Sequence, residues 1–163
     1  MGFKVESDFM HEGFRCAVIM TDMGHRCGYV GIPKDHPLHG IEYTAKAKCL
    51  PKADVSEQPI GKRGIIPLLC LDENEDYLSA ECYFNVHGGI TYSGGRNYPV
   101  ESDGLWWFGY DCAHCDDGKD YEAIENEYVK EIELQFPSHG VVRTNAYCVQ
   151  ECKNLAEQLK AVK

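Results

Sequence analysis

The sequence predicts an α+β protein with a mainly antiparallel sheet and two helices in the C-terminal third. Short strand-like segments separated by turn-forming residues fill the first two thirds of the chain. Apolar residues at helical spacing occur only after Asp120. Because strands come first and helices follow, the order favours α+β over a doubly wound parallel sheet.

Length and composition indicate an ordinary folded domain. The chain has 163 residues, 44% of them hydrophobic and 26% charged. No linker, repeat or low-complexity segment interrupts it, so we expect a single domain over residues 1–163. The formal net charge of -10 disfavours direct binding to nucleic acid or to an anionic membrane. A basic protein partner is compatible with this charge.

The N-terminal sequence MGFKVESDFMHEGF lacks the apolar core of a signal peptide, and no run of 18 apolar residues occurs. We therefore expect a cytoplasmic protein without membrane association. The nine cysteines are an odd number, and without a secretion signal they are expected to be reduced thiols.

The strands are expected where bulky, β-branched or aromatic residues cluster between turn signals. The strongest expectation is a hairpin of strands 14–20 and 28–32 that turns at 22–26. Further strands are expected at 43–49, 82–86, 90–92 and 105–110, with an edge strand or buried connector at 65–71 and an exposed loop at 93–103.

Two helices are expected after these strands. Asp120 can cap a helix over about 121–135, which Pro137 and Gly140 would end. Thr144 can cap the last helix. Its apolar stripe consists of Cys148, Cys152, Leu155, Leu159 and Val162.

The stretch LWWFGYDCAHCDD at 105–117 is the strongest candidate for a functional site. An aromatic strand ends there in a loop that carries carboxylates, thiols and an imidazole. Loops that follow rigid strands often hold reactive groups. A second loop, His87-Gly88-Gly89, combines an imidazole with two glycines that allow close approach of the backbone to a ligand.

The side chains of these loops and of the first hairpin resemble the components of a pocket for a nucleotide-like molecule. Glycine amides and arginine can bind phosphate, and aromatic faces can stack on a base. Since neighbouring strand residues point to opposite faces, we expect only one of the paired tryptophans to face the pocket. The predicted ligand-binding residues are His25, Arg26, His87, Gly88, Gly89, Thr91, Tyr92, Trp107, Asp111 and His114.

No catalytic residue, cofactor or metal ligand is assigned from the sequence, but a divalent metal stays open. His87, Asp111, His114 and Asp116 are the mixed imidazole and carboxylate ligands that a hydrolytic metal site needs. The pairs Cys112/Cys115 and Cys148/Cys152 have a spacing compatible with zinc. Because Cys148 and Cys152 fall on an apolar helical stripe, buried thiols are the favoured reading.

Three blocks resemble an uncharacterised family of small proteins encoded by bacteriophages and prophages. They are MGHRCGYVGIP at 23–33, HGGITYS at 87–93 and WWFGYDCAH at 106–114, with ECKNLAEQL at 151–159 as a fourth stretch. The resemblance covers about half of the chain. It implies a phage origin and a shared site, and hence the cytoplasm of an infected or lysogenic bacterium.

These observations lead to a functional expectation and two alternatives. The expected function is binding and sequestering of a nucleotide-derived small molecule, as an anti-defence protein of a phage. The first alternative is a metal-dependent hydrolase of a phosphoester-like bond. The second is an acidic inhibitor that binds a basic host defence protein. The sequence sets no oligomeric state.

Overall fold

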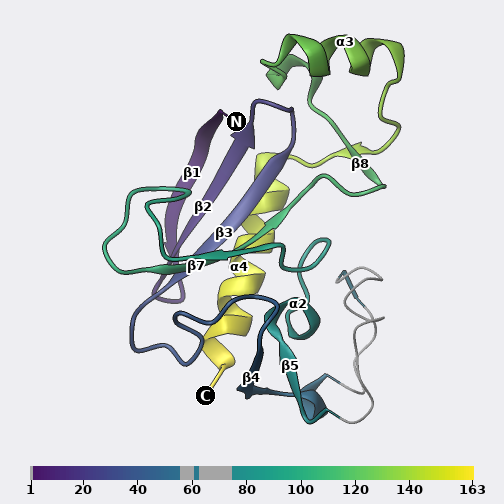
Figure 1. Cartoon of the computed structure of the whole chain (residues 1–163). Coiled ribbons are helices and arrows are strands. Elements are labelled where there is room, and N and C mark those ends of the chain that lie inside the picture. The colour runs from purple at the N-terminus through teal and green to yellow at the C-terminus, as the bar shows by residue number, and fades with distance from the viewer. Residues whose placement is uncertain (1, 56–60, 63–74) are drawn as a thin grey trace.

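A computed structural model describes residues 2–55, 61–62 and 75–163. Its largest element is a five-stranded antiparallel sheet in the order β1-β2-β3-β7-β6 (Figure 1). The strands are β1 (Phe3–His11), β2 (Phe14–Thr21), β3 (Arg26–Ile32), β7 (Trp106–Asp111) and β6 (Tyr92–Gly94). The predicted α+β class with a mainly antiparallel sheet is confirmed.

The centre of this sheet lies where the sequence predicts it. Strands β2 and β3 form the expected antiparallel hairpin, and β7 pairs with β3. The short strand expected at 90–92 begins two residues later, as β6. The sequence did not predict β1, an edge strand whose side chains are largely half-buried or exposed. Such an edge strand lacks the continuous apolar run that marks a buried one.

The long helix α4 (Asn145–Ala161) crosses one face of the sheet and forms the main core with it (Figure 1). As predicted, the Thr144 side chain caps the helix, accepting a hydrogen bond from the Tyr147 amide at 3.2 Å. Four members of the predicted stripe are fully buried, and the fifth, Val162, lies just beyond the helix. The opposite face is covered by the loop that leads to β7, around Tyr29 and Trp107.

Smaller elements flank this layer. Strands β4 (Lys46–Pro51) and β5 (Tyr77–Ser79) form a two-stranded sheet, so the expected strand at 43–49 is shifted toward its C-terminal end. The 3₁₀ turn η1 (Lys52–Asp54) follows β4. The predicted segment 65–71 lies outside the described residues. No helix in the described part of the chain has the length and apolar character needed to cross a membrane.

The strand predicted at 82–86 is wrong. Its first residues belong to the one-turn helix α2 (Ala80–Tyr83), and the rest is extended without a strand partner. Phe84 and Val86 are buried alternately, as in a strand. However, the polar groups of Asn85 bond to α4 side chains, with its amide donating to Gln158 Oε1 at 2.8 Å. The alternation therefore reflects packing on a helix.

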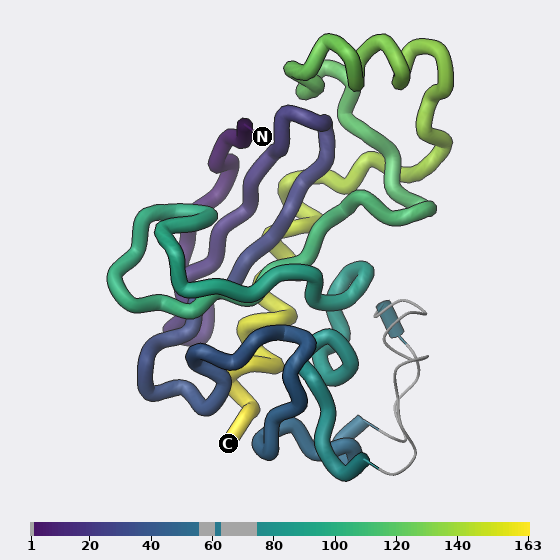
Figure 2. Tube along the Cα trace, viewed as in Figure 1, coloured from purple at the N-terminus to yellow at the C-terminus, as the bar shows by residue number. Residues whose placement is uncertain are grey.

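The helix predicted over 121–135 is shorter than expected. Residues Tyr121–Ala123 form the 3₁₀ turn η2, and α3 covers Glu127–Gln135. Its cap is Asn126 and not Asp120, because the Asn126 side chain accepts hydrogen bonds from the Tyr128 and Val129 amides. Figures 1 and 2 show α3 standing apart from the main sheet.

The segment that contains α3 begins and ends at a small pair of parallel strands. Strand β8 (Asp117–Gly118) pairs with β9 (Val141–Val142). Gly140 allows this approach, since a Cβ there would lie 2.3 Å from the Asp117 carbonyl carbon. Residues about 25 positions apart are thus brought together beside the end of β7 (Figure 2).

Candidate functional site

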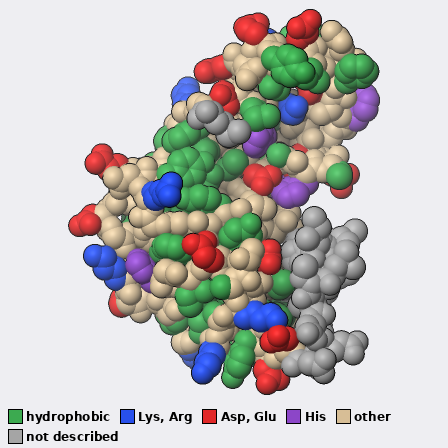
Figure 3. Space-filling model, viewed as in Figure 1, with side chains coloured by type: hydrophobic (Ala, Val, Ile, Leu, Met, Phe, Trp, Pro, Cys, Tyr) green, Lys and Arg blue, Asp and Glu red, His purple; other side chains and the backbone are tan. Residues whose placement is uncertain are grey.

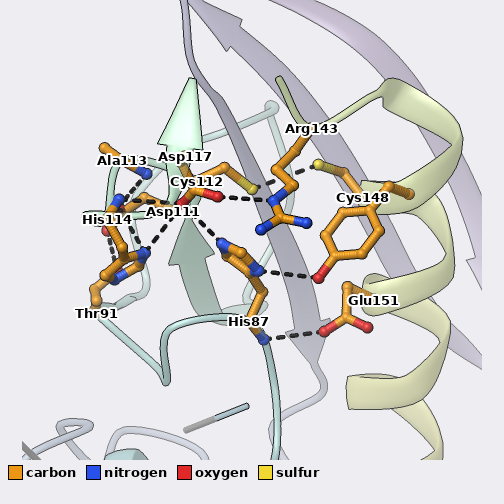
Figure 4. Close-up of polar contacts among 11 residues, drawn as sticks. His87, Thr91, Asp111, Cys112, Ala113, His114, Asp117, Arg143, Cys148 and Glu151 are labelled. Atoms are coloured by element: carbon orange, nitrogen blue, oxygen red, sulfur yellow. Dashed lines mark hydrogen bonds and ion pairs between the residues drawn. The ribbon is translucent and has the colours of Figure 1, made fainter. Parts of the chain in front are cut away.

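The candidate site lies where the loop after β7, the His87-Gly88-Gly89 turn and the start of α4 meet (Figure 4). Both loops that the sequence singles out contribute to it. The imidazole rings of His87 and His114 have centroids 5.6 Å apart. The two histidines therefore belong to one site.

His87 is held on three sides. Its Nε2 lies 2.8 Å from Asp117 Oδ2, and its Nδ1 lies 2.9 Å from the Tyr147 hydroxyl. Its backbone amide donates to Glu151 Oε2 at 2.9 Å. Tyr147 and Glu151 stand one turn apart on α4, so the helix fixes both the ring and the backbone of this histidine.

Asp117 is a buried carboxylate at the centre of the cluster. Its Oδ1 accepts a hydrogen bond from Arg143 Nε at 2.7 Å, and its Oδ2 accepts one from the His114 amide at 3.1 Å. Burial alone would raise the pKa of Asp117, but the hydrogen bonds from Arg143 and His87 outweigh it, so the pKa is lowered. Since an ionised carboxylate only accepts, His87 Nε2 carries the proton shared with Asp117.

His114 lies at the pocket surface with 38% of its side chain exposed. Its Nδ1 is 3.5 Å from Asp117 Oδ2 and 3.9 Å from Asp111 Oδ1. The ring is backed by Gly88, which has a φ of +66° and whose added Cβ would lie 1.9 Å from His114 Cε1. Only glycine satisfies both the backbone conformation and this contact.

Asp111 and Thr91 support the loop that carries His114. Thr91 Oγ1 donates to Asp111 Oδ2 at 2.8 Å, and Asp111 Oδ1 accepts from the Ala113 amide at 3.1 Å. Neither Thr91 nor Asp111 lines the pocket itself. Gly89 has a φ of +87° and closes the turn by donating its amide to the Val86 carbonyl.

The pocket has a volume of about 610 Å³. Two basic side chains among its described residues, Lys62 and Arg143, lie 5.6 Å and 5.1 Å from the centre of the Tyr147 ring. Lys62 also forms an ion pair with the buried carboxylate of Glu151. Burial and the nearby Glu151 carboxylate raise the pKa of Tyr147 to about 12, so its hydroxyl stays protonated.

Arg26 and His25 lie away from the pocket, contrary to the prediction. Arg26 forms an ion pair with Glu6 at 2.6 Å and donates to the Arg143 carbonyl, which ties β3 to β1 and to the start of α4. His25 sits in the β2–β3 turn, where Nδ1 is 3.3 Å from Thr21 Oγ1, and burial lowers its pKa. Neither residue lines the pocket. Arg143 contributes the pocket guanidinium instead.

The predicted aromatic surfaces also lie elsewhere. Trp107 is fully buried on the sheet face opposite α4, and Tyr92 packs against the same cluster. Trp106 is half-buried on the other face, where its Nε1 donates to the Ile41 carbonyl at 3.1 Å. The two tryptophans point to opposite faces of the sheet, as expected, but neither lines this pocket, because each packs in one of the two cores. The aromatic ring at the pocket is that of Tyr147.

Sequence reasoning missed Lys62, Asp117, Arg143, Tyr147 and Glu151. A signal for part of this set was present. Tyr147, Glu151, Asn154 and Gln158 are spaced like the apolar stripe of α4 and form a polar stripe beside it. Asp116, which the sequence favoured over Asp117, is exposed at the rim. Which of two adjacent carboxylates is buried depends on the β8–β9 pairing.

The cysteines are mostly structural. Cys112 and Cys148 are buried with their sulfur atoms 3.7 Å apart, while Cys152 lies beside the Tyr110 hydroxyl. Cys115 is exposed at the pocket. Burial raises the pKa of Cys16 and of Cys27 to about 12, which keeps those thiols protonated. Cys112, Cys115, Cys148 and Cys152 thus do not form one cluster.

Among the described residues, one group of His, Cys, Asp and Glu side chains has the convergence that a metal site needs: His87, His114 and Asp117. One ligand atom of each lies within 4.8 Å of the others. Neither family models nor searches of curated proteins and solved structures gave a match to this chain.

Proposed function

We propose that this protein binds an anionic, nucleotide-derived small molecule in the pocket between His87, His114 and the start of α4. The observation that carries the proposal is the pair of cations, Lys62 and Arg143, beside one aromatic ring in a cavity of about 610 Å³. Small-molecule sites commonly have volumes of about 300–1,000 Å³. The cavity therefore has room for a ligand of nucleotide size.

Arg143 is positioned for recognition of a phosphate. Asp117 holds it through Nε, and within the described part of the chain its terminal nitrogens make no hydrogen bond. Guanidinium groups bind phosphate oxygens through two parallel hydrogen bonds. Asp117 would thus orient Arg143, while the terminal nitrogens remain for the ligand. Because Trp107 and Tyr92 lie elsewhere, phosphate recognition contributes more to this proposal than base stacking does.

The biological role that we propose is sequestering of a nucleotide-derived signal, as an anti-defence protein of a phage. The resemblance to phage proteins motivates this role. The pocket supports it through two cationic side chains, Lys62 and Arg143, which can bind the anionic phosphate of such a signal. The carboxylates of Asp116 and Asp117 also line the pocket. Sequestering further requires that the protein does not cleave the bound ligand, so that denaturation releases it unchanged.

Calorimetric titration tests this proposal. Cyclic dinucleotides and ADP-ribose derivatives serve as ligands, with adenosine as the phosphate-free control. We expect binding of at least one phosphorylated ligand, no binding of adenosine, and unchanged ligand on chromatography after denaturation. R143A and K62A should weaken the binding at least tenfold, because each removes a charge-assisted contact. The absence of heat and of a thermal shift with all ligands would overturn the proposal.

Arg96→Ala is the matched control for these variants. Arg96 is an exposed arginine outside the pocket lining, so R96A changes the net charge by the same amount. We expect it to bind like the unaltered protein. An equal loss of affinity in R96A and R143A would mean that overall charge, and not the pocket, attracts the ligand.

One observation favours the alternative, a metal-dependent hydrolase. The convergence of His87, His114 and Asp117 provides two imidazoles and a carboxylate, with Asp117 in place of the predicted Asp111 and Asp116. In that case the ligand would be consumed over time, and a chelator would stop its loss. The second alternative, an acidic inhibitor, stays a prediction. In Figure 3 the acidic side chains are scattered over the visible face and form no single patch there.

A further inference from the structure

We propose that His87, His114 and Asp117 bind one divalent transition-metal ion, such as Zn²⁺, at the wall of the pocket. This goes beyond ligand binding and does not depend on the proposed anion. Imidazole nitrogen with a carboxylate oxygen is a common ligand set for zinc and related ions. The three side chains come from the His87 turn, the loop after β7, and β8, so the fold brings them together from separate segments.

The spacing of the ligand atoms is close to that around a bound ion. Metal–ligand bonds of about 2.0–2.2 Å at tetrahedral to octahedral angles place ligand atoms about 3.0–3.5 Å apart. Asp117 Oδ2 lies 2.8 Å from His87 Nε2 and 3.5 Å from His114 Nδ1. His87 is fixed by α4, whereas His114 is 38% exposed and can adjust its ring. An ion would move His87 Nε2 and Asp117 Oδ2 slightly apart, and a small movement of the exposed His114 ring would complete the site.

The surrounding hydrogen bonds match those that support metal ligands elsewhere. Ligating histidines usually bond through their second ring nitrogen, and ligating carboxylates are themselves hydrogen-bonded. Tyr147 occupies the second nitrogen of His87 at 2.9 Å, and Arg143 occupies the second oxygen of Asp117 at 2.7 Å. The outer partners are thus in place on the side away from the proposed ion.

Binding of the ion requires that one proton shifts within the His87 imidazole. In the metal-free protein, the proton on His87 Nε2 lies between that nitrogen and Asp117 Oδ2. The ion would take its place between the same two atoms. Neutral His87 would then carry its proton on Nδ1 and donate it to the Tyr147 oxygen. Three protein ligands leave a coordination position open toward the pocket, where water or an anionic oxygen can bind.

The test uses metal ions alone, with chelator-treated full-length protein. Calorimetry with ZnCl₂ and CoCl₂ should show one equivalent bound, whereas MgCl₂ should not bind, because two imidazoles suit transition metals better than hard cations. The Co²⁺ complex should absorb in the visible region and lack the strong near-ultraviolet band of a cobalt–thiolate bond. No binding of Zn²⁺ or Co²⁺ would overturn the proposal and leave the anion-binding proposal untouched.

Variants assign the ligands. His114→Ala removes an exposed ligand, and we expect affinity for Co²⁺ to fall at least about 100-fold, since even loss of an outer partner costs about 10–100-fold. Tyr147→Phe, which removes only the outer hydroxyl, should cost about 10–100-fold. His11→Ala is the matched control, since His11 pairs with Glu157 at 3.0 Å on the outer strand β1, away from the pocket.

Exposed Cys115 requires its own control, because it lines the same pocket and thiolates bind both ions. Cys115→Ser should bind Co²⁺ like the unaltered protein. Loss of binding in C115S together with full binding in H114A would overturn the proposal and assign the ion to sulfur. Full binding in both C115S and H114A would place the ion elsewhere and would overturn it as well.

Discussion

At the scale of single residues, the site depends on Gly88 and on three side chains of α4 and its approach. Gly88 lets the ring of His114 lie against the backbone of the turn. Arg143, Tyr147 and Glu151 hold the acceptor and donor atoms of Asp117 and His87. Because these contacts are short and come from one helix end, His87 keeps a fixed relation to Asp117.

Gly88→Ala should affect the site through a clash with His114 as well as through backbone strain. The added Cβ would lie 1.9 Å from His114 Cε1, so the imidazole must move. Positive φ in a non-glycine residue costs about 1–2 kcal/mol. We expect G88A to lose that stability and also at least tenfold in affinity for Co²⁺, measured by urea unfolding and by absorption titration.

Gly40→Ala separates strain from the clash. Gly40 has a φ of +82°, but nothing lies within 4 Å of its added Cβ. This variant should lose stability through strain alone and bind Co²⁺ normally. If both variants bind the ion equally well, the position of His114 does not depend on Gly88.

At the scale of elements, α4 contributes to the fold through two parallel stripes. Its apolar stripe packs on the sheet, and its polar stripe fixes segment 84–87, which forms no strand. Gln158 Nε2 and Asn154 Nδ2 both donate to the Asn85 carbonyl at 2.9 Å. The helix thus replaces the backbone partners that a neighbouring strand would have provided.

Gln158→Met should therefore destabilise the protein although it keeps the length of the side chain. It removes the acceptor of the Asn85 amide and one donor to its carbonyl. Unsatisfied polar groups cost about 1–3 kcal/mol when they are shielded from water. Urea unfolding measures this loss. Gln150→Met, at an exposed position of the same helix, is the matched control, and an equal loss there would argue against a specific role of Gln158.

At the scale of the whole molecule, the two faces of the sheet have different covers, α4 on one face and the loop that leads to β7 on the other. On the α4 face, His36 joins the 33–40 loop to the end of the helix. Its Nδ1 accepts from the Leu38 amide at 3.1 Å, so its Nε2 donates to the Leu159 carbonyl at 2.9 Å. On the other face, the Tyr29 and Tyr98 hydroxyls lie 2.7 Å apart.

The stability should fall on mild acidification because of His36. Burial lowers its pKa, the Leu159 carbonyl and Asp35 oppose this shift, and His39 adds to it. The unfolded chain, with an ordinary histidine pKa of about 6.5, therefore takes up the proton first as the pH falls. The contribution of His36 is complete above about pH 6.5 and is lost as the pH decreases toward the lower folded pKa.

His36→Asn should reduce the difference in urea midpoint between pH 7.5 and pH 5.5, measured in the presence of chelator. The pKa of His25 is lowered by burial as well, so H25N should reduce the difference further. The exposed His139 provides the matched control H139N. A slope that is unchanged in H36N would show that protonation of His36 is not linked to unfolding.

The sequence by itself determined the elements whose patterns are local. The hairpin of β2 and β3, the strand β7 and the Thr144 cap follow from aromatic and β-branched runs, turn residues and helical spacing within a few positions. It also located both loops of the site, with His87 and His114. The sequence did not predict edge strand β1, because an edge strand has a weak apolar signal. It wrongly predicted a strand at 82–86, because packing on a helix can impose a strand-like alternation.

Only the tertiary structure decided which residues join these loops. Arg26 lies on β3, the strand that pairs with β7, yet Glu6 and the Arg143 carbonyl hold its side chain away from the pocket. Arg143 reaches Asp117 because β9 returns to β8 after the α3 excursion, and Asp117 rather than Asp116 is buried by the same pairing. Such contacts depend on strand register, where a shift by one residue exchanges the faces, and the two-residue strands β8 and β9 are too short to carry the alternating apolar pattern that would fix that register in the sequence.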